Sequence, residues 1–118
     1  MIFQLDTSTD KTIGIAALQA RIDASNCNEL QKAFSQWLQH STNIVFDCSA
    51  LDFIDSSGLG AIVSCLRKAL EHHGDLRLAA LGPKVSLIFE LTKAKKLFSI
   101  YPDTSSAVTS FNAIAAGQ

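Results

Sequence analysis

The sequence contains no long hydrophobic run and no excess of charge of one sign. None of its apolar segments approaches the roughly 20 residues that a membrane-spanning helix needs, so no membrane insertion is expected. Ten Lys and Arg residues stand against eleven Asp and Glu residues, which gives a formal net charge of −1. Nucleic-acid-binding domains usually carry a basic excess, so no nucleic acid partner is expected. The segment from Met1 to Asp6 has no basic region and no signal-peptide core, and we expect a cytoplasmic protein.

Cysteine and histidine are also sparse. The three cysteines lie far apart in the chain, at Cys27, Cys48 and Cys65. An odd number without CxxC spacing argues against both a disulfide framework and a zinc site. The three histidines, two of which are adjacent (His72 and His73), fall at predicted helix ends. We therefore expect buried free thiols, histidines that interact with negative helix termini, and neither a metal nor a cofactor.

The strongest positive signal is a strand–loop–helix pattern between residues 43 and 70. The run Ile44-Val45-Phe46 is short, β-branched and aromatic, which is typical of a strand buried on both faces. A turn at residues 55–58 follows this strand. Beyond it, apolar residues recur at steps of three and four, as on one face of a helix: Leu59, Ile62, Val63, Leu66 and Leu70.

The other segments complete an alternation of strands and helices. Further strands are expected near residues 2–5, 12–18, 76–81 and 97–101. The order β-β-α-β-α-β-α-(β)-α predicts an α/β fold with a mixed sheet of four to five strands. About four helices should pack against this sheet, and 118 residues suit a single domain spanning 1–118.

Several residues are predicted to mark helix ends. The first helix should begin after Ser25 or Asn26, because Asn26 and Glu29 have the spacing of a capping box. Gly74 is the expected residue after the end of the second helix, and Pro83 suits the first turn of the third. The third and fourth helices should each have an apolar face: Val85, Leu87, Ile88 and Leu91 on one, and Ala107, Val108, Phe111 and Ile114 on the other.

The turn Asp55-Ser56-Ser57-Gly58 places two hydroxyls and a carboxylate where the second helix begins. Backbone N–H groups at a helix start lack partners and carry partial positive charge, so a serine there can cap the helix and a phosphate is tolerated. The residues alone leave open whether either serine is more than a cap, and whether Asp55 contacts a partner or only favours the helix start. Gly58 and Gly60 are expected to permit close packing, with access for a partner as a secondary role.

An enzymatic role for these serines is not supported by the sequence. Asp55 stands where a G-x-S-x-G nucleophile elbow would need its first glycine, two residues before Ser57. A nucleophilic serine also needs a nearby base, and the histidines are predicted at the far ends of helices. No P-loop and no dinucleotide-binding glycine signature is present. We expect no catalytic residues and no enzyme activity.

At Asp55-Ser56-Ser57-Gly58-Leu59-Gly60 the sequence resembles the STAS-domain anti-sigma factor antagonists. The resemblance extends over nearly the whole chain and includes three further segments: Arg21-Ile22-Asp23-Ala24, Ile44-Val45-Phe46-Asp47 and Lys95-Lys96-Leu97-Phe98. It implies a STAS-like fold and a partner switch. Such a protein binds a GHKL-type anti-sigma factor that is also a serine kinase, and is released when the kinase phosphorylates it. A PP2C-type phosphoserine phosphatase reverses the modification.

Carried over residue by residue, the resemblance assigns phosphorylation to Ser56, with Ser57 as the second choice and as the expected helix cap. The loop aspartate that helps to bind the kinase falls on Asp23. The expected partner-binding residues are thus Asp23, Asp55, Ser56, Ser57 and Gly58. The glycine often seen before the loop aspartate is absent from this chain.

Two alternatives remain open from the sequence. One is a STAS subunit of a lipid-transport ABC complex, although that relative usually has threonine and alanine in place of Ser56 and Ser57. The other is a structural binding module that is never phosphorylated. Co-purification with an ABC ATPase or with a small GHKL kinase would distinguish them.

Overall fold

The strands form a five-stranded mixed sheet with a separate pair of short strands at one end. The computed structural model describes the backbone of residues 1–116 and the side chains of residues 1–112. The main sheet has the order β1-β2-β4-β6-β7, formed by β1 (Ile2–Asp6), β2 (Ile13–Ala17), β4 (Asn43–Asp47), β6 (Asp75–Ala79) and β7 (Ile100–Tyr101). β1 and β2 are an antiparallel hairpin, and the other neighbours are parallel. The short pair consists of β3 (Arg21–Ile22) and β5 (Phe53–Ile54).

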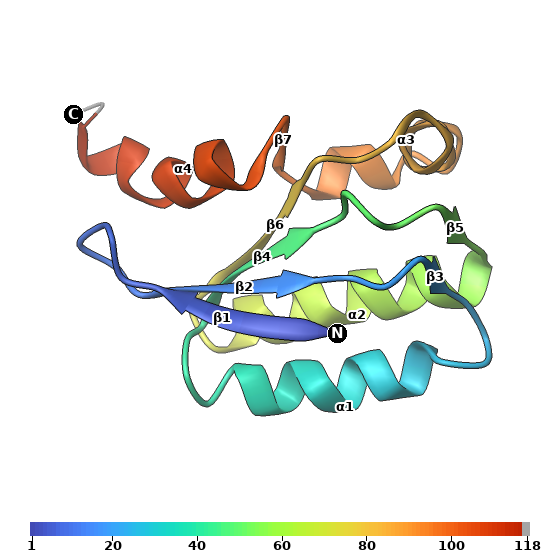
Figure 1. The fold of residues 1–118 in the computed structure, drawn as a ribbon, viewed down its shortest axis with the longest axis horizontal. Coiled ribbons are helices and arrows are strands. Elements are labelled where there is room, and N and C mark those ends of the chain that lie inside the picture. Colours follow the sequence, from blue (N-terminus) through green and yellow to red (C-terminus); the bar gives the residue numbers. More distant parts are fainter. Residues whose placement is uncertain (117–118) are drawn as a thin grey trace.

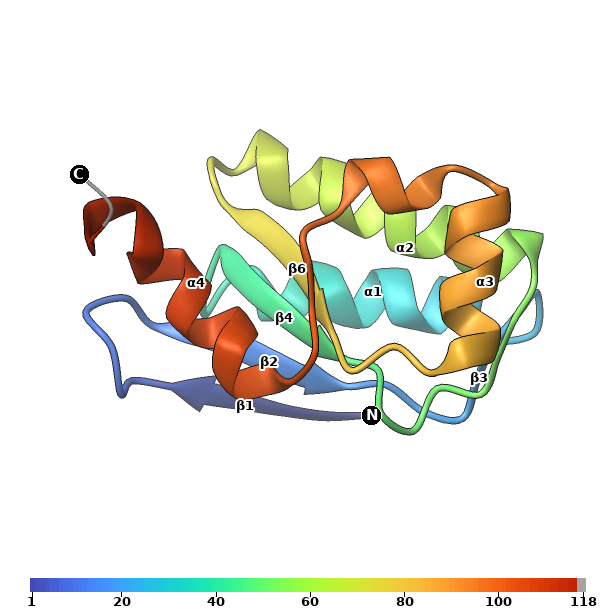
Figure 2. The ribbon, with the colours of Figure 1, turned by 90° about the horizontal axis from the view of Figure 1, so that it is seen from above.

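Helices cover both faces of this sheet (Figure 1). They are α1 (Cys27–Trp37), α2 (Ser56–Glu71), α3 (Pro83–Leu91) and α4 (Thr104–Ala116), with a 3₁₀ turn η1 (Ala94–Leu97). α1 and α2 pack side by side on one face, and α4 lies on the opposite face against β4, β6 and β7. α3 crosses the end of the molecule near the start of α2 (Figure 2). The structure confirms the α/β class, the mixed sheet and the four helices.

The central strand β4 is buried on both faces, as its sequence predicts. Ile44 and Phe46 belong to the larger core under α1 and α2, whereas Val45 belongs to the smaller core under α4. All three side chains are fully buried. Phe34 of α1 meets Phe46 edge to face with ring centres 5.7 Å apart, a favoured arrangement for aromatic pairs. The alternation along one strand thus builds two cores at once.

Some predicted apolar faces are less buried than expected. Leu70 of α2 is 55% exposed, and Leu87 and Leu91 of α3 are 52% and 74% exposed. α3 buries only Val85 and Phe89, one helical turn apart, because it crosses the end of the sheet instead of lying along it. The apolar face predicted for α3 is therefore only partly buried. The last helix does bury its predicted face at Ala107, Val108 and Phe111, while the side chain of Ile114 lies outside the described residues.

The end of α2 also differs from the prediction. His73, not Gly74, adopts the left-handed conformation, with φ of 63°. The amides of His73 and Gly74 donate to the carbonyls of Leu70 and Ala69, over 3.0 and 2.9 Å, which is the bonding of a Schellman motif. Gly74 is needed for another reason, since a Cβ atom there would lie 1.8 Å from the carbonyl oxygen of Thr42.

The last predicted strand is shorter than expected. Residues 94–97 form η1, and only Ile100 and Tyr101 pair with β6. No helix in residues 1–116 combines the length and the apolar character needed to cross a membrane. Among the described side chains, no buried polar nitrogen or oxygen lacks a hydrogen-bond partner.

Arg77 of β6 joins α4 to the sheet. Its Nε lies 3.0 Å from Asp75 Oδ2, and its Nη1 donates to Ser110 Oγ over 2.7 Å. The guanidinium also stacks on Phe111, with Cζ 4.1 Å from the ring centre. One planar group therefore makes a charged, a polar and an aromatic contact with two elements, which an ammonium group cannot reproduce.

We expect Arg77→Lys to lower the free energy of unfolding by about 1.5 kcal/mol. The reason is that lysine keeps the charge but loses the forked donors and the stacking. Urea unfolding monitored by circular dichroism measures the loss. Arg67→Lys is the matched control, because Arg67 is exposed, and it should change stability by less than about 0.5 kcal/mol. Equal losses in the two variants would contradict this role of Arg77.

Candidate functional site

The candidate site lies where β3 and β5 bring two loops together at the start of α2. The two strands are parallel, with Arg21 opposite Phe53 and Ile22 opposite Ile54. The chain leaving β3 therefore runs beside the chain that enters α2. The sequence analysis missed both strands, because two residues are too few to show a strand periodicity. The sequence places Asp23 in one loop and the serine pair in another, and the hydrogen bond from the Ala24 amide to Asp55 shows that the two loops meet.

Asp55 joins the two loops and caps α2. Its Oδ1 accepts a hydrogen bond from the Gly58 amide over 2.8 Å, and its Oδ2 accepts one from the Ala24 amide over 3.2 Å. Its backbone is extended, as at a helix N-cap. The prediction that Ser57 caps the helix is wrong, because Asp55 occupies the cap position and Ser57 is the second helical residue. Asp55 is thus a positioning residue whose two oxygens are both engaged within the chain.

We expect Asp55→Ala to lower the free energy of unfolding by about 2 kcal/mol, since it removes the cap and the bond to the neighbouring loop. Asp55→Asn should lower the free energy of unfolding by less, because the amide oxygen of asparagine can still accept one of the two hydrogen bonds. Thermal unfolding of the two variants measures the difference. Ser57→Ala is the control and should stay within about 0.5 kcal/mol of the parent; a larger loss there would restore Ser57 as the cap.

Ser56 and Ser57 are the first two residues of α2, and both are exposed. Neither hydroxyl takes part in a hydrogen bond within the part of the chain that the structure describes. With the cap supplied by Asp55, both are available to another molecule at a fixed backbone position. The helix start offers partial positive charge to any anion placed there.

Gly58 confirms the expected close packing, whereas Gly60 does not. A Cβ atom at Gly58 would lie 2.0 Å from the carbonyl oxygen of Ile22, so β3 can approach α2 only because the side chain is absent. A Cβ atom at Gly60 would have no heavy atom within 4 Å. Gly60 is exposed and faces open space, which leaves room for another molecule along this side of α2.

The loop that carries Asp23 is held by its own side chains. Asp23 Oδ1 accepts bonds from the Ser25 amide and hydroxyl, and Oδ2 lies 3.2 Å from Arg21 Nε. These hydrogen bonds, the Ser25 hydroxyl first, lower the pKa of the Asp23 carboxyl. Asn26 Oδ1 accepts from the Asp23 amide and Asn26 Nδ2 donates to the Arg21 carbonyl, both over 2.8 Å. Asn26 is the first residue before α1 as predicted, but its side chain orders the loop instead of capping the helix.

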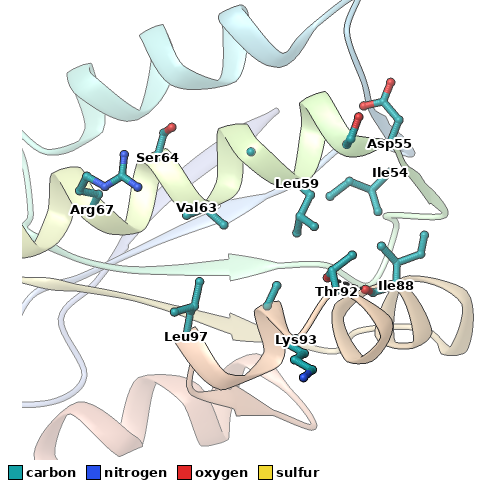
Figure 3. Close-up of a pocket in the computed structure, with 13 residues that line it drawn as sticks. Ile54, Asp55, Leu59, Val63, Ser64, Arg67, Ile88, Thr92, Lys93 and Leu97 are labelled. Carbon is teal, nitrogen blue, oxygen red and sulfur yellow. Dashed lines mark hydrogen bonds between the residues drawn. The ribbon is translucent and has the colours of Figure 1, made fainter.

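A groove of about 710 Å³ runs from Ser56 along α2. One wall is α2, and the other is formed by α3 and η1 (Figure 3). Its lining is mostly apolar, with Leu59, Val63, Ile88 and Leu97 among its residues. The apolar spacing on α2 and α3 predicts an apolar face on each helix but no groove between them, because it does not show how the two helices are placed. The number of apolar residues on these two helices is the feature of the sequence that could have indicated an exposed apolar groove.

The three histidines lie far from the serine pair. His72 caps the C-terminal end of α2, and its Nδ1 is 2.9 Å from the Lys68 carbonyl oxygen, as expected for a histidine at a negative helix end. His72 lies sixteen positions after Ser56, which corresponds to about 24 Å along the helix. His40 follows α1 at the same end of the molecule. No histidine is therefore placed to act as a base for Ser56 or Ser57.

The cysteines are free, as predicted. Burial raises the pKa of Cys48 and of Cys65 to about 12, so both remain protonated thiols near neutral pH. Cys27 is partly buried at the start of α1. Within the described residues, no group of three or more histidine, cysteine or acidic side chains is arranged to hold a metal ion.

Together, these features define a small α/β domain built on a mixed sheet, with an exposed serine pair at the start of a central helix. The sequence profile of the STAS domain matches residues 4–107 of the chain. The protein therefore belongs to the STAS domain family.

Relatives and a solved structure agree with this assignment. BtrV of Bordetella bronchiseptica, which is classed with the anti-sigma factor antagonists, is 26% identical over 98 residues, or 82% of this chain and 84% of BtrV. The anti-sigma F factor antagonist of Paenibacillus polymyxa is 21% identical over 117 residues, or 98% of this chain and all of the relative. A crystal structure from Thermotoga maritima, also classed with these antagonists, superposes with a TM-score of 0.77 at 24% identity and covers 92% of both chains. This likeness shows that the two proteins share a fold.

Proposed function

We propose that this protein is an anti-sigma factor antagonist in a cytoplasmic partner-switching pathway. In its unphosphorylated form it binds a GHKL-type anti-sigma factor that is also a serine kinase. Phosphorylation of Ser56 releases it, and a PP2C-type phosphatase restores it. The proposal is supported by the serine motif, by the STAS family and by the names of its relatives in Bordetella and Paenibacillus.

The observation that carries the proposal is the free, exposed hydroxyl of Ser56 on a rigid backbone. A kinase needs a hydroxyl that solvent can reach and that is held in one place. Asp55 supplies the helix cap by accepting the bond from the Gly58 amide, so the Ser56 hydroxyl is not needed for this role. The partial positive charge of the helix start offsets part of the cost of a phosphate. The unphosphorylated and phosphorylated forms should therefore have the same fold.

Ser56 is favoured over Ser57 because it lines the groove beside α2, whereas Ser57 is not among the groove residues. A phosphate on Ser56 would thus lie at the groove, on a surface that a bound partner would contact. Asp23 and Ser57 offer further contacts on the same surface. Asp55 and Gly58 contribute by positioning, through the cap and through the close approach of β3.

Phosphorylation by candidate GHKL-type kinases tests the proposal. The protein is incubated with each kinase and Mg-ATP, and mass spectrometry locates any phosphate. Ser56→Ala should abolish the modification while it keeps the binding, and Ser57→Ala should still be modified. If only Ser57→Ala loses the modification, the phosphorylated residue is Ser57 and not Ser56. Binding of an ABC ATPase in place of every kinase would contradict the proposed pathway.

A further inference from the structure

The groove beside α2 is open and apolar along its length. Leu59 and Val63 of α2 face Ile88 of α3 and Leu97 of η1 across it (Figure 3). Leu97 is 56% exposed, although most leucines in a small domain are buried. An apolar groove next to a proposed binding surface marks a site that another molecule covers.

The charged residues of the groove are two cations and one carboxylate. Arg67 and Lys93 line it, and neither belongs to an ion pair among the described side chains. The ammonium of Lys93 points away from α2 (Figure 3), so Arg67 is the cation on the α2 wall. The one acidic residue of the groove, Asp55, already accepts two backbone hydrogen bonds. An occupant with acidic side chains would therefore complement Arg67, and a basic occupant would be repelled there.

The α2 wall has the shape that a second helix needs. Ser56, Gly60 and Ser64 recur at steps of four along its groove side, and small side chains let two backbones approach closely. The space above Gly60 is empty to at least 4 Å. From Ser56 to Arg67 the wall extends over twelve residues, or about 16 Å, which corresponds to three turns of a partner helix.

We propose that the groove between α2 and α3–η1 binds an acidic amphipathic helix of the partner protein, with apolar residues on the groove floor and carboxylates toward Arg67. This inference rests on the proposed function, because it describes the partner segment that Ser56 controls. A phosphate on Ser56 would stand at one end of the groove and repel an acidic helix. The groove would thus be closed by charge without a change in its shape.

A pair of synthetic peptides tests the charge preference. Both have about 16 residues, long enough to form helix, with leucines at helical positions i, i+3, i+4 and i+7. One has glutamates on its flanks, and the other has lysines at the same positions. We expect the acidic peptide to bind the full chain at least about tenfold more tightly. Amide resonances of Leu59, Gly60, Val63 and Leu97 should shift in the NMR spectrum of the labelled protein.

Two substitutions locate the binding. Gly60→Leu should fill the groove and abolish binding while it keeps the helix. Glu71→Leu, at an exposed position of the same helix outside the groove, should not abolish binding. Arg67→Glu should weaken binding of the acidic peptide at least about tenfold. Lys32→Glu makes the same charge change on an exposed site of α1 and should have no effect.

Several results would overturn the inference. Equal affinity for both peptides, or tighter binding of the basic one, would reject the acidic helix. Concentration-dependent shifts of the same resonances without peptide would assign the groove to a second copy of the chain, and binding of dodecanoate alone would assign it to an amphiphile. If Gly60→Leu and Arg67→Glu still bind the kinase partner and respond to phosphorylation, the groove inference fails while the proposed function stands.

Discussion

Gly58→Ala is expected to lower the free energy of unfolding by about 3 kcal/mol, the upper range for overpacking of a core. The added Cβ atom would lie 2.0 Å from the Ile22 carbonyl oxygen and 2.7 Å from its carbonyl carbon. Both contacts are with backbone, so no side-chain rotation can relieve them. β3 would have to move away from α2, which would strain its pairing with β5 and the bond between Asp55 and the Ala24 amide.

Gly60→Ala provides the control on the same helix. Alanine is favoured over glycine within a helix by about 1 kcal/mol, and the space at Gly60 is open, so this variant should be at least as stable as the parent. Urea unfolding of the two variants compares them directly. Equal stability of both would show that β3 can withdraw from α2 without loss, and would remove Gly58 from the support of the site.

Phosphorylation of Ser56 is expected to weaken binding of the kinase partner about 100-fold, which is about 2.7 kcal/mol. The phosphate adds a charge of roughly −1.5 to −2 at pH 7 near Asp23 and Asp55. Two unit charges 4 Å apart interact by about 4 kcal/mol at an effective dielectric constant of 20, so local repulsion and steric blockage suffice. Ser56→Asp should weaken binding in the same direction but less, because it adds one charge and a smaller group.

Calorimetric titration of the partner with the unphosphorylated, phosphorylated, Ser56→Ala and Ser56→Asp forms measures this effect. Ser57→Asp places the same charge one residue away, outside the groove, and should weaken binding less than Ser56→Asp. NMR spectra of the phosphorylated form should show shifts confined to the surroundings of α2. A wholesale change in its spectrum, or unchanged affinity, would contradict a switch that acts at the interface.

The fold class could be predicted because its signals are local. The buried run at Ile44-Val45-Phe46, the apolar period of α2 and the break at Pro83 each identify an element without knowledge of its neighbours. The order of these elements then limits the topology to a mixed sheet covered by helices. The structure and the STAS profile confirm this prediction.

The details of the site depended on contacts that the sequence does not display. Ser56, Ser57 and Asp55 are all preferred cap residues, and only the extended backbone of Asp55 and its bond to the Gly58 amide decide among them. The groove arises because α3 crosses the end of the sheet, which leaves Leu97 exposed and Ile88 on a wall. Helix crossing depends on tertiary packing, so the apolar pattern alone could not distinguish a buried face from an open one.

The two hydrogen bonds that the Asp55 carboxylate accepts have a consequence for the rate at which a partner associates. One carboxylate fastens the chain after β3 to the start of α2, so the surface around Ser56 has its final shape before any encounter. Association then requires no ordering step and loses little chain entropy. We expect the on-rate to depend on collision, orientation and the charges of the two surfaces, without a slow rearrangement of the site.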